Sequence, residues 1–518
     1  MNNASRPISG ALLIAAFVAA AAFAAVAAPH QAAPSPSPSP SGSPAPLPTA
    51  TPEPPSIAIP RLEAKLKADP NDRDTAIQLA SYYLEAGRPD LSLPITQKLL
   101  QTGTKNAQVY YFDGLANQSI GRIKEATDDL EAASNLEPTN SQVLLTLTDL
   151  YLQTGRPADA ERIAKRATAF NQTDPRSFIN YGLVLAQEKK YDEARAQFEA
   201  AAKLEPKDPQ PIILEAKSYV DQNAVALAQQ TYDRALVVDP KSIEAMLGKA
   251  RLYVAEHQIK DAIAAYEKVL PLLPDDETRA TLVCEEGKAY AAEKMPAEAE
   301  AQFKRAIADY PKSMVGHLAY GDYLAQNNQL AQAEAEWTAA LGPNRDNREA
   351  LLRLGEYYLR KGDTQRGIDT YKRLADLSPN DAAAMGLLGQ AYSFAHQYSQ
   401  ARDAYRKSFE LARTPQALAG LGAADYSLHN YKECSEIFDA IDKGASDFVR
   451  QNPTLYVIMG QCYAETNQKS KAKDAYTRFL SFVKPNSQAA TDIKKKIADL
   501  DKPAAKPTPK PTATPKPH

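Results

Sequence analysis

The sequence predicts an all-α solenoid of about twelve helix-turn-helix repeats, with disordered tails at both ends. Three observations support this fold class. Equivalent residues recur about every 34 positions between Ala80 and Gly460, each repeat combines small residues with an aromatic one, and both chain ends are rich in proline. A single hairpin with apolar residues on both outer faces is not stable alone, so it needs copies of itself on either side.

The stretch from Tyr181 to Pro206 shows the pattern of one repeat. Gly182 and Ala194 are small enough to let two helices approach, and Phe198 fills the space between them, while Pro206 ends the second helix. A larger side chain at a small position is expected to cost about 1–3 kcal/mol. The repeat-defining small residues include Gly114, Gly182, Gly321, Gly355, Gly389 and Gly460 on first helices, and Ala194 and Ala262 on second helices.

This pattern resembles the tetratricopeptide repeat, a helix-turn-helix unit of 34 residues. The resemblance covers about residues 57–500 and implies a right-handed superhelix whose first helices line a concave groove. Some positions depart from the family pattern. Leu130 and Ala164 replace the aromatic residue, and Thr104, Gln172 and Arg345 stand where proline is usual.

The residues before the array are predicted not to belong to the fold. Residues 1–27 combine Arg6 with an uncharged apolar run and small residues before the expected cleavage after Ala27, which is typical of a signal peptide. An uncleaved N-terminal anchor is the alternative, because the apolar run is at the short limit for spanning a bilayer. Residues 28–56 form a Pro/Ser-rich linker that favours extended polyproline II.

The array itself is predicted over residues 57–485, followed by a capping helix at 486–500 and a Lys/Pro-rich tail at 501–518. Two insertions interrupt the period, one near Glu277–Arg279 and a longer one around Gly444–Asn452. The tail carries lysines and few acids. It is either a plain solubilising terminus or an arm that contacts an anionic cell-wall polymer.

Nothing in the sequence indicates an enzyme, a cofactor or a metal site. A net charge of −3 gives no general attraction to nucleic acid or to an anionic membrane. His257, His396 and His429 fall in turns between helices, and no catalytic motif is present. Of the three cysteines, Cys434 and Cys462 lie on neighbouring predicted helices; we expect small buried apolar residues there, with a disulfide as the alternative.

The resemblance implies that ligands are chosen by exposed groove residues of the first helices. At one equivalent position Lys217, Arg251 and Lys288 are followed by Asp322 and Glu356. Three successive cations suggest a surface for an acidic segment, whereas independent solvated charges are the simpler reading. Near the N-terminus, Ile77 and Tyr111 are candidate apolar anchors for a bound peptide.

These features predict a non-catalytic protein–protein interaction scaffold. It would be exported to the periplasm, the extracellular space or the cell envelope, where it would bind a peptide segment or partner protein during envelope assembly, secretion or surface-polymer export. The membrane would be involved only if residues 1–27 stay uncleaved. A structural spacer that contacts cell wall or polysaccharide through the basic tail is the alternative, and a substrate-positioning subunit of a separate enzyme is a third.

Overall fold

The computed structural model describes residues 53–342 and 346–501. The predicted signal peptide or anchor at 1–27, nearly all of the linker at 28–56, and the tail beyond residue 501 lie outside the described residues. Over the described ranges the chain forms 27 α-helices, one short 3-10 helix and no strand. The all-α solenoid predicted from the repeats is therefore confirmed.

Twelve helical hairpins follow one another along the chain. They pair α3 (Arg73–Glu85) with α4 (Pro89–Gln101), α5 (Ala107–Ser119) with α6 (Ile123–Leu136), α7 (Ser141–Gln153) with α8 (Pro157–Phe170), α9 (Pro175–Gln187) with α10 (Tyr191–Leu204), α11 (Gln210–Asp221) with α12 (Val225–Val238), α13 (Ile243–Ala255) with α14 (Ile259–Val269), α15 (Asp276–Ala292) with α16 (Pro296–Asp309), α17 (Val315–Gln326) with α18 (Leu330–Ala339), α19 (Arg348–Lys361) with α20 (Thr364–Leu377), α21 (Ala382–Phe394) with α22 (Tyr398–Leu411), α23 (Pro415–Ser427) with α24 (Tyr431–Gly444), and α26 (Leu455–Glu465) with α27 (Lys469–Leu480).

Single helices flank this array. α2 (Pro55–Ala68) precedes the first hairpin, α25 (Ser446–Gln451) is inserted before the last, and α28 (Gln488–Leu500) follows it. Because α2 begins at Pro55, the linker expected to run to residue 56 ends earlier than predicted. Proline suits this place, since its fixed φ is already helical and its missing N–H is not needed in the first turn.

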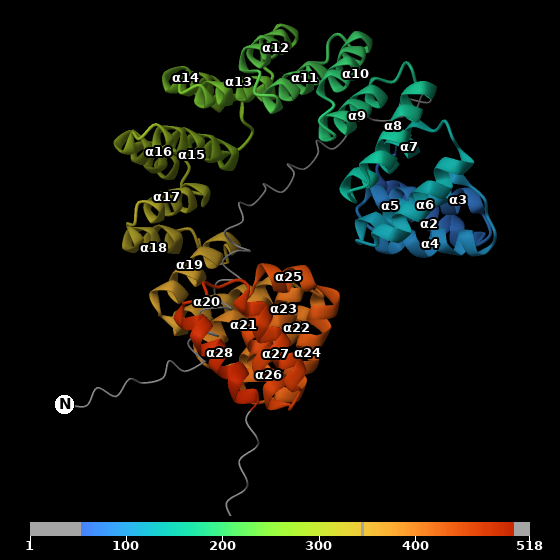
Figure 1. The fold of residues 1–518 in the computed structure, drawn as a ribbon. Coiled ribbons are helices and arrows are strands. Elements are labelled where there is room, and N and C mark those ends of the chain that lie inside the picture. The colour runs from blue at the N-terminus through green and yellow to red at the C-terminus, as the bar shows by residue number, and fades with distance from the viewer. Residues whose placement is uncertain (1–52, 343–345, 502–518) are drawn as a thin grey trace, which may run out of the picture. The chain divides into compact units, whose positions relative to one another are not determined.

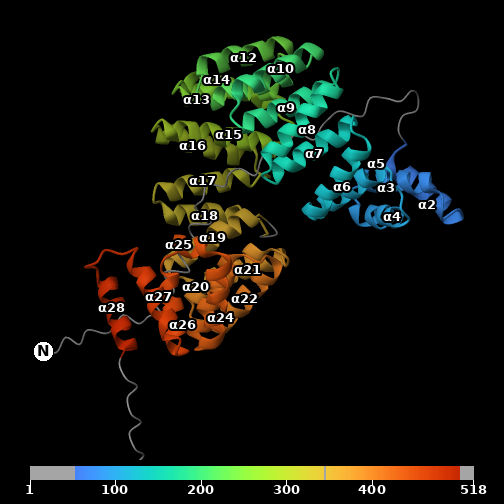
Figure 2. The ribbon, with the colours of Figure 1, turned by 45° about the vertical axis from the view of Figure 1, so that its right-hand side comes forward.

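The array divides into two compact units, with the boundary inside α16. The N-terminal unit comprises the described residues up to Gln302, and the C-terminal unit begins at Phe303. Within each unit successive helices pack against one another, as α9 and α10 do in one unit and α21 and α22 in the other, and first helices of neighbouring repeats also touch, as α7 and α9 do in one unit and α21 and α23 in the other. Figure 1 and Figure 2 show the hairpins of each unit following one another in chain order.

Close contact between glycine and an aromatic ring sets the distance between the helices of a hairpin. A Cβ placed on Gly182 would lie 2.4 Å from Phe198 Cε1, and one on Gly355 would lie 2.4 Å from the same atom of Tyr371. The other repeat-defining glycines face their partners in the same way: Gly114 meets Leu130, Gly321 meets Trp337, Gly389 meets Tyr405, and Gly460 meets Tyr476. Ala194 and Ala262 are fully buried on the second helices.

Some of these rings also contact the following repeat. Tyr405 lies against Gly389 of its own hairpin, and a Cβ on Gly420 of the next first helix would come within 2.6 Å of the same ring. Tyr232 is likewise in contact with Gly248 of the next repeat. One aromatic side chain therefore packs two neighbouring hairpins at once.

Short polar side chains begin most of the first helices. The side chains of Asp72, Asn106 and Asn140 each accept a hydrogen bond from a backbone N–H of the first turn, at intervals of 34 residues. Such caps satisfy amide groups that have no partner inside the helix. Asp174, Ser242, Asp275, Asn347, Asp381 and Thr414 do the same in later repeats.

The turn inside each hairpin needs one residue with a left-handed backbone. Gly87, Gly121, Gly155 and Gly362 have φ between 68° and 82° at this place. Eight other repeats use residues with a Cβ, at φ between 56° and 62°: Lys189, Asn223, His257, Lys294, Asn328, His396, His429 and Asn467. The histidines predicted to lie in turns thus occupy the left-handed position of their hairpins. Glycine would adopt this backbone conformation with less strain.

Both insertions become helical. The three extra residues are absorbed where α14 continues into the 3-10 turn Leu270–Leu272 and α15 extends to 17 residues. The longer one forms α25, whose Val449 is fully buried beside Ile441. Both inserted segments contribute to the hydrophobic core, the first through Leu273 and the second through Val449.

Cys434 and Cys462 form a disulfide between α24 and α26, with a Cα–Cα distance of 6.0 Å. The disulfide expected as the alternative is therefore the arrangement in the structure, in place of two separate buried thiols. Both cysteines occupy fully buried positions on packed neighbouring helices, which brings their side chains together. Cys284 remains a free thiol, and burial raises its pKa to about 12.

Candidate partner-binding site

The candidate site is one equivalent position on successive first helices of the N-terminal unit. Lys217 lies on α11, Arg251 on α13 and Lys288 on α15, and all three side chains are exposed. The repeat fixes this arrangement because each of the three directly follows, by one residue, a buried small position of its helix. The structure thus brings the three predicted cations onto consecutive first helices.

Two of these cations hold an acidic partner on the next first helix. Lys217 Nζ lies 2.5 Å from Glu244 Oε1, and Arg251 Nη2 lies 3.1 Å from Glu285 Oε1. The four side chains keep between 30% and 61% of their surface exposed. Exposed pairs of this kind contribute about 0–1 kcal/mol each. They reduce the repulsion that three adjacent cations would otherwise create.

Lys288 differs from the other two. Among the residues that the structure describes, it has no carboxylate within ion-pair distance, and its side chain is exposed. Glu285, one turn earlier on the same helix, is turned to Arg251 instead. Within the described ranges, Lys288 is therefore the one cation of the row without an ion-pair partner.

The two predicted anions are held by the protein itself. Asp322 is half-buried and accepts hydrogen bonds from Trp337 Nε1 at 3.0 Å and from Arg353 Nε at 2.6 Å. Glu356 pairs with Arg360 one turn along the same helix, at 2.6 Å. Asp322 is thus part of a structural network between α17 and α19, and we assign it no part in recognition.

Asp149 shows the same arrangement in the N-terminal unit. Its Oδ1 accepts a hydrogen bond from Asn180 Nδ2 at 2.8 Å, over the same separation of 31 residues as the Arg353–Asp322 pair. Burial raises the pKa of the Asp149 carboxyl. The repeat period relates residues 34 positions apart. Asn180 and Arg353 lie only 31 residues after their partners, so these pairs were not predicted.

The two predicted apolar anchors belong mainly to the core. Tyr111 is 8% exposed, and its Oη lies 3.3 Å from Thr146 Oγ1; burial raises the pKa of this phenol. Ile77 is half-buried and packs in the cluster of Leu99 and Val109. The aromatic ring of Tyr111 is therefore unavailable to a ligand on the surface.

A second polar cluster lies inside the N-terminal unit. Asn117 donates hydrogen bonds to Asp113 at 3.2 Å and to Asp129 at 2.9 Å, and Thr96 donates to Asp113. Burial, followed by the nearby Asp113 charge, raises the pKa of Asp129 to about 7. The cluster lies between α4, α5 and α6 and was not found from the sequence, because neither aspartate breaks the repeat pattern.

The described part of the chain shows no cluster of three or more histidine, cysteine or acidic side chains arranged to hold a metal ion. No helix within those ranges has the length and apolar character needed to cross a membrane. His257 Nδ1 lies 2.6 Å from Glu293 Oε1 in the neighbouring turn.

Comparison with protein families gives matches along most of the array. Five models, each described as a tetratricopeptide repeat, match residues 121–177, 175–208, 213–277, 318–382, 382–415 and 455–481. Together these matches cover more than half of the chain.

Two curated proteins show local similarity. Photosystem I assembly protein Ycf3 of Synechococcus sp. (strain CC9605) is 32% identical over 84 residues, which is 16% of this chain and 49% of that protein. The same protein of Parasynechococcus marenigrum (strain WH8102) is 32% identical over 109 residues, 19% of this chain and 63% of that protein. The matches thus span only half to two thirds of these relatives.

One similar solved structure is that of YrrB, a tetratricopeptide-repeat protein described as having an unusual peptide-binding site. It is 22% identical, with a TM-score of 0.32, and the match covers 36% of this chain and 95% of that one.

Proposed function

Because the chain belongs to the tetratricopeptide repeat family, we propose that it is a non-catalytic scaffold that binds an acidic segment of a partner protein. The binding surface is the first-helix face of the N-terminal unit around Lys217, Arg251 and Lys288. The observation that carries this proposal is the exposure of three cations at one equivalent position of consecutive first helices.

The ion pairs of this face suit exchange with a ligand. Glu244 and Glu285 are part-exposed partners whose pairs contribute little to stability, so carboxylates of a bound segment can replace them at small cost. Lys288 is available without any exchange. Electrostatic matching of this kind mainly raises the association rate and the specificity, and both fall as salt is added.

We further propose that the scaffold acts outside the cytoplasm, in envelope assembly, secretion or surface-polymer export. The sequence of residues 1–27 supports this placement. The Cys434–Cys462 disulfide also supports it, because disulfides persist in oxidising compartments and are rare in the cytosol.

The test is a pull-down from an envelope extract with the full chain and two triple variants. In the first, Lys217, Arg251 and Lys288 are each changed to glutamate. In the matched control, the exposed Lys165, Lys207 and Lys241 of the same unit are changed to glutamate, so that the net charge changes equally. We expect the first variant to lose the partner and the control to keep it. Equal recovery of partners by all three proteins would refute the assigned surface.

A further inference from the structure

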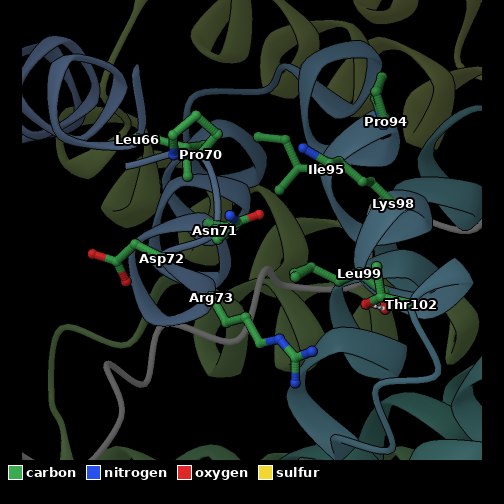
Figure 3. A pocket seen from close by; sticks show the side chains of 11 residues that line it. Leu66, Pro70, Asn71, Asp72, Arg73, Pro94, Ile95, Lys98, Leu99 and Thr102 are labelled. Atoms are coloured by element: carbon green, nitrogen blue, oxygen red, sulfur yellow. Dashed lines mark hydrogen bonds between the residues drawn. The ribbon is translucent and has the colours of Figure 1, made fainter. Parts of the chain in front are cut away.

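A cavity of about 380 Å³ lies at the first hairpin, away from the row of cations. It is open to solvent on one side and is lined by the end of α2, the loop to α3, the first turns of α3 and the second half of α4. Figure 3 shows Leu66 and Pro70 on one side of the space and Ile95 and Leu99 of α4 on the other. Its volume is at the lower end of the range of about 300–1,000 Å³ typical of ligand sites.

One residue of the cavity lining is smaller than its equivalents in the following repeats. Ala76 lines it from α3. At the equivalent position the next five repeats carry large side chains, namely Tyr110, Leu144, Phe178, Ile212 and Met246. Leu144 and Ile212 are buried in the cores of their repeats. The first repeat therefore lacks a side chain of the size of leucine or phenylalanine at a place where its relatives have one.

The charges at the cavity are positive on balance. Arg73 and Lys98 line it and are exposed, and neither has an acidic partner within ion-pair distance in the described ranges. The one acid of the lining, Asp72, is already used: its Oδ2 lies 3.0 Å from Lys65 Nζ, and its Oδ1 caps α3 at the N–H of Thr75. In Figure 3, Arg73 reaches from α3 and Lys98 from α4 toward the gap between them.

We propose that this cavity is a second recognition site, which takes one leucine or phenylalanine of a partner's acidic peptide segment. The incoming apolar side chain occupies the space that Ala76 leaves open, and carboxylates on either side of it pair with Arg73 and Lys98. The apolar lining supplies affinity by burial of the incoming side chain, while the two cations set the orientation and exclude basic segments. This site is independent of the first-helix face proposed above.

The test uses a fluorescein-labelled, terminally blocked nonapeptide of sequence Gly-Ser-Asp-Asp-Leu-Asp-Asp-Ser-Gly, with binding to the full chain followed by fluorescence polarisation. Two further peptides, one with alanine for leucine and one with asparagine for each aspartate, separate the apolar from the charged contribution. We expect both to bind at least tenfold more weakly than the parent peptide.

Two protein variants test the site from the other side. Ala76→Leu fills the cavity with the residue that Leu144 provides two repeats later, and Arg73→Gln with Lys98→Gln removes the charges without filling it. Each is expected to weaken binding of the parent peptide at least tenfold, with circular dichroism and melting temperature confirming the fold. If Ala76→Leu melts early, the surface double variant still decides the question.

The triple variant of Lys217, Arg251 and Lys288 is expected to keep the tenfold preference for the leucine peptide over the alanine peptide, whatever its overall affinity for acidic peptides. A preference for leucine that Ala76→Leu leaves unchanged would reject the cavity and leave the first-helix face standing. Absence of binding to the wild type up to 1 mM peptide would also overturn the inference, without bearing on the pull-down.

Discussion

Asp322 and Arg353 join two neighbouring first helices through a two-pronged ion pair: Arg353 Nε donates to Oδ1 at 2.6 Å and Nη2 donates to Oδ2 at 2.9 Å. Trp337 of the intervening helix donates to the same carboxylate. Burial alone would lower the pKa of the Arg353 guanidinium, but its interactions with Asp322 and Glu349 together outweigh burial, so the pKa is raised. The pair thus ties three consecutive helices of the C-terminal unit together.

Replacing Arg353 by methionine should destabilise the C-terminal unit by about 1–3 kcal/mol, because a half-buried carboxylate loses its charged partner. Hydrogen exchange of peptides from α17 and α19 measures the effect locally. Arg360→Ala, which removes the part-exposed pair with Glu356, should change stability by no more than about 0.5 kcal/mol. Equal effects of the two substitutions would contradict the structural role of Asp322.

Gly355→Ala should destabilise the C-terminal unit by about 1–3 kcal/mol, since the new methyl group would overlap the Tyr371 ring. Gly386 provides a control in the same unit, because a Cβ there would meet only Ser408 Oγ, at 3.4 Å. Alanine at that helical position should be neutral or stabilise by up to about 1 kcal/mol. Thermal unfolding followed by circular dichroism compares the two.

Lys189→Gly should stabilise the N-terminal unit by about 1 kcal/mol, because Lys189 has a φ of 62° in the turn between α9 and α10. The reverse change is the control: Gly155→Ala, at φ 68° in the preceding hairpin, should destabilise by a similar amount. A loss of stability in both variants would show that the Lys189 side chain contributes more than its backbone strain costs.

The cluster around Asp129 should make the N-terminal unit pH-dependent. Burial raises the folded-state pKa of Asp129 from 3.8 to about 7, so the folded state retains a proton that the unfolded chain loses. The corresponding stabilisation is complete below about pH 4 and is lost as the pH rises through about 7. We expect about 1 kcal/mol, well below the full linkage because the group is half-exposed.

Asp129→Asn should remove this dependence, and the variant should be more stable than the wild type at pH 8. Hydrogen exchange of α5 and α6, compared between pH 5 and pH 8 after correction for the intrinsic rates, reports it. Asp128→Asn, on the exposed face of the same helix, serves as the control.

The disulfide should stabilise the last two hairpins. It closes a loop over a separation of 28 residues, and loops of this size are stabilised by about 2–4 kcal/mol. Cys434→Ala with Cys462→Ala should lower the melting temperature by the same amount as adding reductant to the wild type. If the reductant has no effect on the wild type, the two thiols are not joined in solution.

The repeat period made the fold predictable from sequence because small and aromatic residues have to recur wherever hairpins stack. Gly182 and Phe198 are informative as a pair, since a Cβ at residue 182 would lie 2.4 Å from the Phe198 ring. The contact between Tyr232 and Gly248 was not predictable in the same way, because Gly248 lies outside the column that defines the repeats.

The candidate site was less accessible to this reasoning. The exposure of Lys217, Arg251 and Lys288 followed from their register, but the partners Glu244 and Glu285 depend on how two helices are offset. Asp322 and Tyr111 occupy positions that the repeat predicts to face the groove. The structure pairs Asp322 with a neighbouring arginine and buries Tyr111. The sequence shows that Ala76 is a small residue at a position where the following repeats have large ones. That a cavity remains beside Ala76 is seen only in the structure.

The sharing of rings such as Tyr405 between adjacent hairpins has a consequence for how the molecule comes apart. When one hairpin unfolds, the aromatic ring of the preceding hairpin loses part of its packing. The preceding hairpin is therefore destabilised as well. Such a chain should unfold from its ends inward, one hairpin after another. The stability of the terminal helices then determines the temperature at which unfolding begins.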